Sequence, residues 1–549
     1  MFRNFSLRDN RGTWFLVFIL CIAGILRLYK LTEIPPNLEW DEVATGYDAY
    51  SILKTGRDQF GNFLPLTFRS LDDYKPPLYT YLTSVSIAVF GWNDFAVRFP
   101  AALLGILTIF TTYKLVLALI QNEKVALMSA LFLAISPWHV NFSRLALETN
   151  STIFFMTAGM WLFLKGLKKG KWLIVSALFF GLNLYLYHNA RIFVPIILVA
   201  LMILYRRELW QARIYSLIAA LVLGILIIPL IPIVTSTAGQ MRFQGTSIFT
   251  DAVTLDMAKT KATYQRMRSY DDANGLEIYG RLFHNQYVLF GLLIFKNYLS
   301  HFAPNFFVFT QDYPRHHAPE MGILYFTDIL FLVIGMYMLI RHNSRRIWSL
   351  ILVWILAAPI AASVTRDVPH ALRSEIFLPM LLIAVAAGIL WLIKSLPRSF
   401  AKLGIGLICL IYFIQVSFFL HKYLFHFSRE TSQFWQYGNR ETAIFAESVK
   451  NNYEKIVVSP RLEQPHMFFL YYLKYDPAKY LASGGTVSGG WGEQQNHFAK
   501  YYFKFFDFDK ERDGKTLFIG TPKEFPTGVS VLKRINYLNG EPAVWIVEG

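Results

Sequence analysis

Acidic and basic side chains stand at the edges of the long apolar segments of this 549-residue chain. Asp41 and Glu42 follow Trp40, and Lys75 lies in the sequence Asp-Tyr-Lys-Pro-Pro at 73–77. A carboxylate can accept the proton of a hydroxyl group, and a lysine can neutralise a phosphate. Both features also have a structural interpretation, because acidic residues cap helices and a lysine near a membrane extends to the interface.

Charged residues also follow three later apolar segments. Arg144 and Glu148 are four residues apart, so on one continuous helix they would share a face and form an ion pair. His188 and Arg191 would likewise share a face if their helix continued. The segment 366–373 reads Arg-Asp-Val-Pro-His-Ala-Leu-Arg, and its proline argues against a continuous helix.

Together these residues place cations beside carboxylates. Contacts with lipid headgroups would explain any single arginine, but the whole set suits a phosphate-bearing lipid next to an acid–base site. The cations are Lys75, Arg144, Arg191, Arg366 and Arg373, and the carboxylates are Asp41, Glu42 and Glu148.

The composition indicates a membrane protein, because 54% of the residues are hydrophobic, 16% are charged and the mean hydropathy is +0.36. Nearly all of the net charge of +16 lies before residue 422, in the same region as the apolar segments. Basic residues between membrane spans indicate how the spans are oriented in the membrane, so the charge does not point to a nucleic-acid partner. Membrane lipids are the expected surroundings. Eleven apolar segments have spanning length, namely 14–30, 99–120, 125–141, 149–165, 172–188, 191–205, 214–236, 322–340, 347–364, 373–393 and 403–421.

Every second connector between these segments is rich in basic residues. All of these basic connectors lie on the same side of the membrane as the N-terminus. The positive-inside rule therefore predicts a cytoplasmic N-terminus, and an odd number of spans places the C-terminus outside. Three long pieces are then extracytoplasmic: a first outer loop at 31–98, a fourth at 237–321 and the region 422–549. The stretch 76–90 is expected to form a re-entrant or surface helix.

The C-terminal region carries strand-like runs at 455–459 and 516–519 and a probable hairpin around Asn539-Gly540. We therefore predict an α-helical polytopic membrane protein with large extracytoplasmic loops. Its transmembrane catalytic domain would occupy residues 1–421, and a small α/β domain residues 422–549.

The order of several motifs resembles the GT-C glycosyltransferases, and among them the protein O-mannosyltransferase and aminoarabinose (lipid A) transferase group. The motifs are Trp-Asp-Glu at 40–42, Asp-Tyr-Lys-Pro-Pro at 73–77, Arg98 with Pro100, Ser-Pro-Trp-His at 136–139 with Arg144 and Glu148, and the segment 366–373. The resemblance covers residues 1–421 and implies a helical bundle whose first outer loop forms the active site. It further implies a plasma-membrane enzyme that moves a hexose or pentose from polyprenyl phosphate to an extracytoplasmic acceptor, usually with inversion.

The resemblance also assigns roles to individual residues. Asp41 matches the acidic residue taken as catalytic base, with Glu42 as its companion, and Glu148 is similar to the acidic residue of the second outer loop. Lys75 matches the lysine that contacts the donor phosphate, and the further phosphate-binding candidates are Arg144, Arg191, Arg366 and Arg373. Substrate contacts are expected from Tyr74, His139, His188 and His370. The acceptor, whether protein, lipid or glycan, does not follow from the resemblance.

No cofactor is implied with certainty, and a divalent metal stays open. Asp312 with Arg315, His316 and His317 offers a His-His metal site, but two further ligands cannot be named, so surface histidines are the favoured interpretation. The alternative function is a polyprenyl-lipid flippase or transporter without transferase chemistry, which would need ionisable groups inside the spans. Such groups are scarce there, with Asp328 as the clearest exception, and their scarcity argues against transport. A catalytically inactive scaffold is the third hypothesis.

Overall fold

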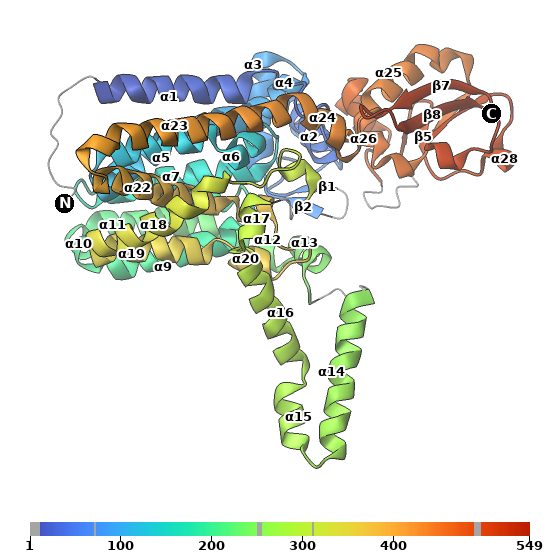
Figure 1. Cartoon of the computed structure of the whole chain (residues 1–549). Coiled ribbons are helices and arrows are strands. Elements are labelled where there is room, and N and C mark those ends of the chain that lie inside the picture. Colours follow the sequence, from blue (N-terminus) through green and yellow to red (C-terminus); the bar gives the residue numbers. More distant parts are fainter. Residues whose placement is uncertain (1–10, 71–72, 250–254, 310–311, 488–495) are drawn as a thin grey trace.

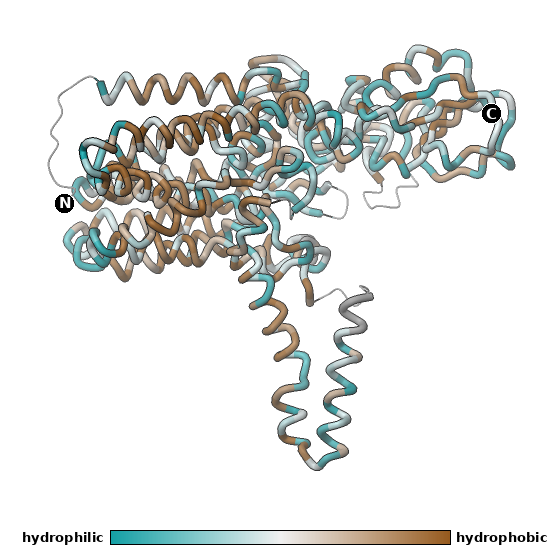
Figure 2. Tube along the Cα trace, viewed as in Figure 1, coloured by the Kyte–Doolittle hydropathy of each residue, from teal (hydrophilic) through white to brown (hydrophobic). Residues whose placement is uncertain are grey.

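The structure, a computed structural model, describes residues 11–70, 73–249, 255–309, 312–487 and 496–549. Most of these residues form a bundle of helices, in which hydrophobic residues predominate (Figures 1 and 2). Each of the eleven predicted apolar segments contains one helix of the bundle. These helices are α1 Arg11–Leu28, α4 Asp94–Ile120, α5 Glu123–Ile135, α7 Glu148–Gly166, α8 Lys171–Asn183, α9 Ala190–Leu204, α11 Arg213–Ile227, α18 Phe326–His342, α19 Arg345–Ala357, α22 Leu378–Ser395 and α23 Arg398–His421.

Within the described residues, five helical stretches are long and apolar enough to cross a membrane: Arg11–Leu28, Asp94–Ile120, Arg345–Ser363, Ala371–Ser395 and Arg398–Trp435. They confirm that the chain is a multi-pass membrane protein. The remaining apolar helices are shorter, so the count of eleven spans and the orientation of the termini stay predictions.

Small residues let the helices at the centre of the bundle approach closely. Gly335 of α18 lies so near α22 that a Cβ there would be 1.7 Å from the carbonyl oxygen of Ala384. A Cβ at Gly388 of α22 would be 2.1 Å from the carbonyl oxygen of Phe331 on α18. Any larger residue at either position would push the two helices apart, because the obstacle is backbone in both cases.

Shorter elements gather at one end of the bundle, which we call the α2 end. They include α2 Trp40–Thr55, the hairpin of β1 Phe68–Ser70 and β2 Asp73–Lys75, and α3 Leu78–Phe90. The stretch predicted as a re-entrant or surface helix is thus helical. The others are α6 Pro137–Phe142, α12 Leu230–Thr235, α13 Thr237–Thr246, α17 Pro304–Val308, the 3-10 turn η1 Pro314–His316, α20 Ile360–Ser363 and α21 Ala371–Ser374; α10 Arg206–Gln211 connects α9 to α11.

Three helices of the predicted fourth outer loop project away from the α2 end (Figure 1). They are α14 Leu255–Ala273, α15 Glu277–Phe283 and α16 Gln286–Ser300. This long loop therefore has regular structure of its own, as its length requires.

The C-terminal region contains a six-stranded sheet in the order β4-β5-β3-β6-β8-β7. Strands β5, β3 and β6 are parallel, and the outer pairs are antiparallel. The strands are β3 Lys455–Val458, β4 His497–Phe498, β5 Tyr501–Phe503, β6 Thr516–Gly520, β7 Val531–Asn536 and β8 Pro542–Glu548; the helices are α24 Phe427–Thr431, α25 Asn439–Val449, α26 Pro465–Tyr472, α27 Pro477–Ala482 and α28 Phe508–Glu511. The predicted strands and hairpin are confirmed, while a separate domain from residue 422 stays a prediction.

Hydrogen bonds join the C-terminal region to the first predicted outer loop. The hydroxyl of Tyr472 donates to Oδ1 of Asn37 at 2.8 Å. The backbone N–H of Trp40 donates to Oε1 of Gln436 at 3.3 Å. These contacts place the C-terminal region directly beside the beginning of α2, where the acidic residues lie.

Candidate active site

Helix α2 presents two acidic residues in its first turn. Glu39 is the N-cap of the helix, and Glu39 and Glu42 form a capping box in which each side chain accepts from the backbone of the other. Asp41 lies between them, in the first turn of the helix. The helix-cap interpretation is thus correct for Glu42, whereas Asp41 points elsewhere.

Glu42 is fully enclosed and holds the loop in place. Its Oε1 accepts from Nε of Arg98 at 2.9 Å and from the backbone of Ala146 at 2.7 Å. Its Oε2 accepts from Arg98 at 2.8 Å and from the backbone of Glu39 at 3.1 Å. Both side chains of the Glu42–Arg98 pair have 0% exposure. The structure therefore gives Glu42 a positioning role in place of the predicted catalytic one.

Asp41 pairs with Lys75 at the α2 end of the bundle. Oδ1 of Asp41 lies 2.6 Å from Nζ of Lys75, and the side chains are 28% and 8% exposed. The β1–β2 hairpin delivers the lysine, because Lys75 is the last residue of β2 and pairs in register with Phe68. The two sequence motifs thus meet in one ion pair that solvent reaches from the Asp41 side.

The charges around Lys75 keep it protonated. Burial lowers the pKa of Lys75, but the carboxylates of Asp41, Glu148 and Glu39 outweigh it and raise the pKa above the ordinary value. Lys75 is therefore a cation at neutral pH, in a position where few water molecules compete for it. A fixed, poorly hydrated cation can stabilise charge that develops on a phosphate.

Glu148 begins α7 and lies close enough to Lys75 to influence its pKa. The chain between α6 and α7 is not helical, and Arg144 lies in this break. The expected intrahelical pair of Arg144 and Glu148 is therefore wrong. The guanidinium of Arg144 instead donates to the carbonyls of Leu26, Lys30 and Ile34, which gives it a positioning role and not the predicted phosphate contact.

Glu39 is a member of the site that the sequence motifs did not single out. Its side chain contacts Arg315 of η1 and is 2% exposed. Burial raises the pKa of Glu39, against the opposing effect of Arg315, and the neighbouring carboxylates of Asp41 and Glu42 raise it further. The only signal in the sequence was its place just before Trp40, where an N-cap residue would stand.

The motif around Lys75 also meets the segment between α8 and α9. Nε2 of His188 lies 3.0 Å from the carbonyl oxygen of Tyr74, and Nδ1 lies 3.2 Å from a guanidinium nitrogen of Arg191. Helix α8 ends at Asn183 and α9 begins at Ala190, so the two residues meet across a turn and not on a continuous helix.

A small cavity of about 140 Å³ lies beside this contact. His188 and Arg373 line it together with Thr365 and with apolar residues, among them Ile192 and Phe243. Arg373 is fixed there by donating to Oγ1 of Thr365 and to the carbonyl of Arg366, both at 2.7 Å. A cavity lined by a cation together with apolar residues suits the junction of a phosphate and a prenyl chain.

Three predicted residues lie apart from the Asp41–Lys75 pair. His139 is buried in the bundle, with Nδ1 2.6 Å from Arg27. The guanidinium of Arg366 contacts the backbone carbonyl of Gly245. His370 lies near Asp312, in the cluster described next. As predicted, the segment around Pro369 is not a continuous helix, since α20 ends at Ser363 and α21 begins at Ala371.

Asp312, His316 and His370 form a buried cluster whose potential ligand atoms all lie within 4.8 Å of one another. Oδ2 of Asp312 lies 2.8 Å from Nδ1 of His316 and accepts from the backbone of Ala371 at 2.7 Å. His316 and His317 are both buried, so the interpretation as surface histidines is wrong.

The protonation states of this cluster are those of metal ligands. Burial lowers the pKa of both His316 and His370, so the imidazoles are neutral. Burial raises the pKa of Asp312, but His316 and backbone N–H groups outweigh it, and the net pKa is lowered. Two neutral imidazoles and a carboxylate fit a divalent transition metal, and these three residues are the ones that would hold it.

Comparisons with known proteins match part of the sequence and nearly all of the fold. The profile of the family described as dolichyl-phosphate-mannose-protein mannosyltransferase matches residues 74–233. The putative mannosyltransferase YycA of Bacillus subtilis is 26% identical over 183 residues, which are 32% of this chain and 25% of the relative. An uncharacterised protein of Aquifex aeolicus is 30% identical over 148 residues, 26% of this chain and 28% of the relative. The chain thus matches only about a quarter of the length of these relatives.

Solved structures share the fold at low sequence identity. ArnT from Cupriavidus metallidurans in the apo state has a TM-score of 0.56 and 14% identity, and the match covers 98% of both chains. The oligosaccharyltransferase of Archaeoglobus fulgidus, in a structure tethered to an acceptor peptide, has a TM-score of 0.53 and 13% identity over 85% of this chain and 63% of that one. Both are GT-C glycosyltransferases. The chain therefore has the fold of the GT-C glycosyltransferases, and its residues 74–233 are similar to the dolichyl-phosphate-mannose-protein mannosyltransferase family.

Proposed function

We propose that this protein transfers a hexose or pentose from a polyprenyl-phosphate carrier to an acceptor at the extracytoplasmic face of the plasma membrane, with inversion at the sugar. The observation that carries the proposal is the Asp41–Lys75 pair, a partly exposed carboxylate 2.6 Å from a buried cation. The family match and the GT-C fold support a glycosyltransferase, and one neighbouring structure is ArnT bound to undecaprenyl phosphate.

Asp41 is the proposed general base. Its side chain is 28% exposed, so an acceptor hydroxyl can approach the carboxylate. As the acceptor oxygen bonds to the anomeric carbon of the sugar, its proton passes to the carboxylate of Asp41. A hydroxyl is a weak nucleophile, so this proton transfer is needed for the attack.

Lys75 is the proposed partner of the leaving group. The bond between the anomeric carbon and the phosphate oxygen breaks as the new bond forms, and polyprenyl phosphate leaves with the electron pair. The raised pKa of Lys75 keeps it cationic, so it can compensate for the charge that grows on the phosphate. His188 and Arg373, at the neighbouring cavity, would contact the same phosphate or the start of the prenyl chain.

A single displacement inverts the sugar, because the attacking acceptor oxygen and the leaving phosphate oxygen lie on opposite faces of the ring. Glu148 and Glu39 act on this step through Lys75, whose pKa they raise. We propose the predicted orientation, with a cytoplasmic N-terminus, since it places the Asp41–Lys75 pair on the outer side together with the C-terminal region.

The test is sugar release from a panel of radiolabelled short-chain polyprenyl-phosphate sugars, with extracted cell-envelope fractions as acceptors. Purified wild-type protein should consume one donor and label an acceptor, and Asp41→Asn should lose this activity. Glu33→Gln is the matched control, because Glu33 is an exposed carboxylate of the same loop and pairs with exposed Lys30. Donor binding without consumption by the wild-type protein would contradict the proposal and favour transport.

A further inference from the structure

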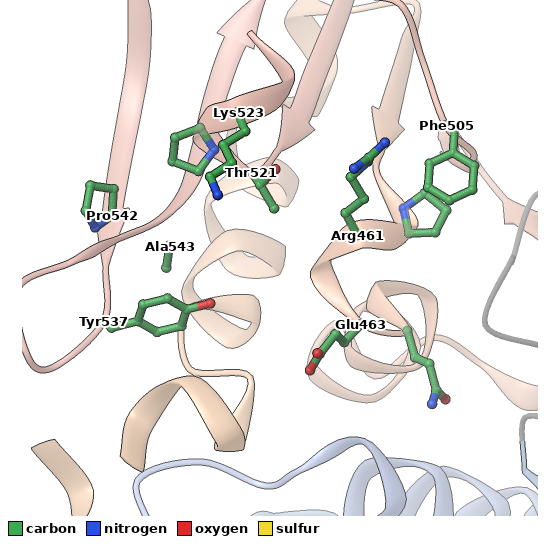
Figure 3. A pocket seen from close by; sticks show the side chains of 11 residues that line it. Arg461, Glu463, Phe505, Thr521, Lys523, Tyr537, Pro542 and Ala543 are labelled. Carbon is green, nitrogen blue, oxygen red and sulfur yellow. The ribbon is translucent and has the colours of Figure 1, made fainter. Parts of the chain in front are cut away.

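A cavity lies in the C-terminal sheet, at the carboxyl ends of its parallel strands. Its volume is about 660 Å³, and the segments that follow β3, β5 and β6 supply most of its lining (Figure 3). In open sheets with parallel strands, ligands bind at this edge. The volume falls within the range of roughly 300–1,000 Å³ that small-molecule sites occupy.

Aromatic rings and hydrogen-bonding groups share the walls of this cavity. In Figure 3 Tyr537 and Phe505 lie on opposite sides, with the cations Arg461 and Lys523 between them and Glu463 below. Aromatic rings offer flat faces on which the C–H face of a sugar ring can stack, and the polar groups around them can pair with hydroxyls.

One buried polar group in the lining lacks a partner. Gln464 is 4% exposed, and within the described part of the chain its Nε2 makes no hydrogen bond. Glu463 and Gln464 also hold φ angles of 60° and 59°, in the left-handed region that residues other than glycine rarely adopt. Buried amide donors are normally satisfied, so this one indicates a missing acceptor, and the unusual backbone indicates that the two side chains are held here for a reason.

The cavity is connected to the candidate active site through two hydrogen bonds. Oε2 of Glu463 accepts from Nε2 of Gln436 at 2.8 Å, and Oε1 of the same glutamine accepts from the backbone of Trp40 at 3.3 Å. Trp40 directly precedes Asp41. The charge of Arg315, which contacts Glu39, also lowers the pKa of Glu463, although burial raises it overall. The wall of the cavity is therefore linked, through Glu463 and Gln436, to the residue that precedes the proposed base.

The surrounding sheet favours a glycan over a peptide. Strands β5, β3, β6 and β8 are each paired on both sides, so an extended peptide cannot add a strand at the cavity. Stacking on Phe505 and Tyr537 with hydrogen bonds from Gln464, Thr521 and the two cations needs a ligand with ring faces and many hydroxyls. Carbohydrates have this combination.

We propose that this cavity binds a carbohydrate segment of the acceptor and so presents a hydroxyl to Asp41. The proposal rests on the proposed transferase function, which it deepens by naming a glycan as the acceptor class. Phe505 and Tyr537 stack on the sugar rings, Gln464 donates to a hydroxyl, and Glu463 with Gln436 fixes the floor of the cavity relative to α2.

Binding is tested on the full-length protein in detergent by saturation-transfer NMR with three probes: maltotetraose, tetragalacturonic acid and a serine- and threonine-rich decapeptide. At least one oligosaccharide should bind, and Phe505→Ala with Tyr537→Ala should weaken it about tenfold or more. Gln464→Ala should weaken it less, while Tyr502→Ala, an exposed tyrosine on β5 that does not line the cavity, should leave it unchanged. Binding of the peptide alone, or of no probe, would overturn the proposal.

A second measurement separates this proposal from the transferase itself. In the transfer assay the Phe505→Ala/Tyr537→Ala variant should raise the KM for the acceptor and leave the KM for the donor unchanged. Unaltered acceptor kinetics would refute the acceptor site and leave the transferase intact. Oligosaccharide binding that persists in a wild-type protein without transfer activity would instead refute the transferase and retain the carbohydrate site.

Discussion

Asp41 and Glu42 are neighbours in the sequence, and yet they serve two different regions of the molecule. Asp41 pairs with Lys75 where solvent reaches the carboxylate, with 28% of the side chain exposed. Glu42 pairs with Arg98 at 0% exposure, and backbone N–H groups occupy its remaining lone pairs. A carboxylate that must exchange a proton with an acceptor needs an open side, whereas one that must hold a loop needs every oxygen engaged. Two adjacent residues of one helical turn thus have different roles: Asp41 is the proposed base, and Glu42 stabilises the fold.

The largest expected effect is on the buried pair. Arg98→Met should destabilise the protein by roughly 3–5 kcal/mol, because it leaves the carboxylate of Glu42 buried without its cation. A lowered melting temperature in detergent would be the sign. A melting temperature equal to that of the wild type would show that the Glu42–Arg98 pair does not stabilise the fold.

The Asp41–Lys75 pair, in which only the carboxylate is partly exposed, should behave differently. Lys75→Met is expected to lower kcat for transfer by about 10²–10³-fold, because a fixed donor to the leaving phosphate is lost. The melting temperature should fall less than in Arg98→Met, because solvent reaches the carboxylate of Asp41 that Lys75→Met leaves without its cation. Lys75→Arg keeps the charge and should recover part of the rate. Steady-state kinetics of both variants test this prediction, after circular dichroism has shown that they are folded like the wild type.

Glu39 offers a test by pH. Burial raises its pKa in the folded protein, so the folded state retains a proton that the unfolded state loses above its ordinary pKa of 4.5. Its contribution to stability is therefore complete below about pH 4.5 and is lost as the pH rises through the raised pKa. The melting temperature of the wild type should fall more between pH 5 and pH 8 than that of Glu39→Gln. Parallel pH profiles would show that Glu39 ionises normally.

The smallest effect is expected at the edge of the site. His188 contacts the carbonyl oxygen of Tyr74, the residue before Lys75, at 3.0 Å, and should help to position Lys75. His188→Ala is predicted to reduce kcat/KM by about three- to tenfold, chiefly by raising the KM for the donor. This is the effect expected from the loss of about one hydrogen bond. An effect as large as that of Lys75→Met would place His188 on the phosphate itself.

The sequence predicted much of the fold because long apolar segments and basic connectors are strong signals. Helices lie in all eleven predicted segments, and the Asn539-Gly540 hairpin forms between β7 and β8. The meeting of Asp41 with Lys75 was expected from the motifs and is present in the structure.

Other parts of the site could not be predicted, since they depend on where helices end and on what each side chain meets in space. A non-helical segment between α6 and α7 separates Arg144 from Glu148, and the guanidinium of Arg144 donates hydrogen bonds to three backbone carbonyls. His370 joins His316 and Asp312 from a distant loop, which no local spacing could indicate. Glu39 has no motif, and only its burial against Arg315 identifies it.

The most direct test of the central claim compares Asp41→Asn and Glu42→Gln in one experiment, with transfer activity and melting temperature measured on the same preparations. The account predicts that Asp41→Asn loses about 10²–10⁴-fold in transfer and keeps its melting temperature, because only a general base is removed. Glu42→Gln should lower the melting temperature, and its rate per folded molecule should fall far less. Full transfer activity in Asp41→Asn would contradict the claim that Asp41 is the base.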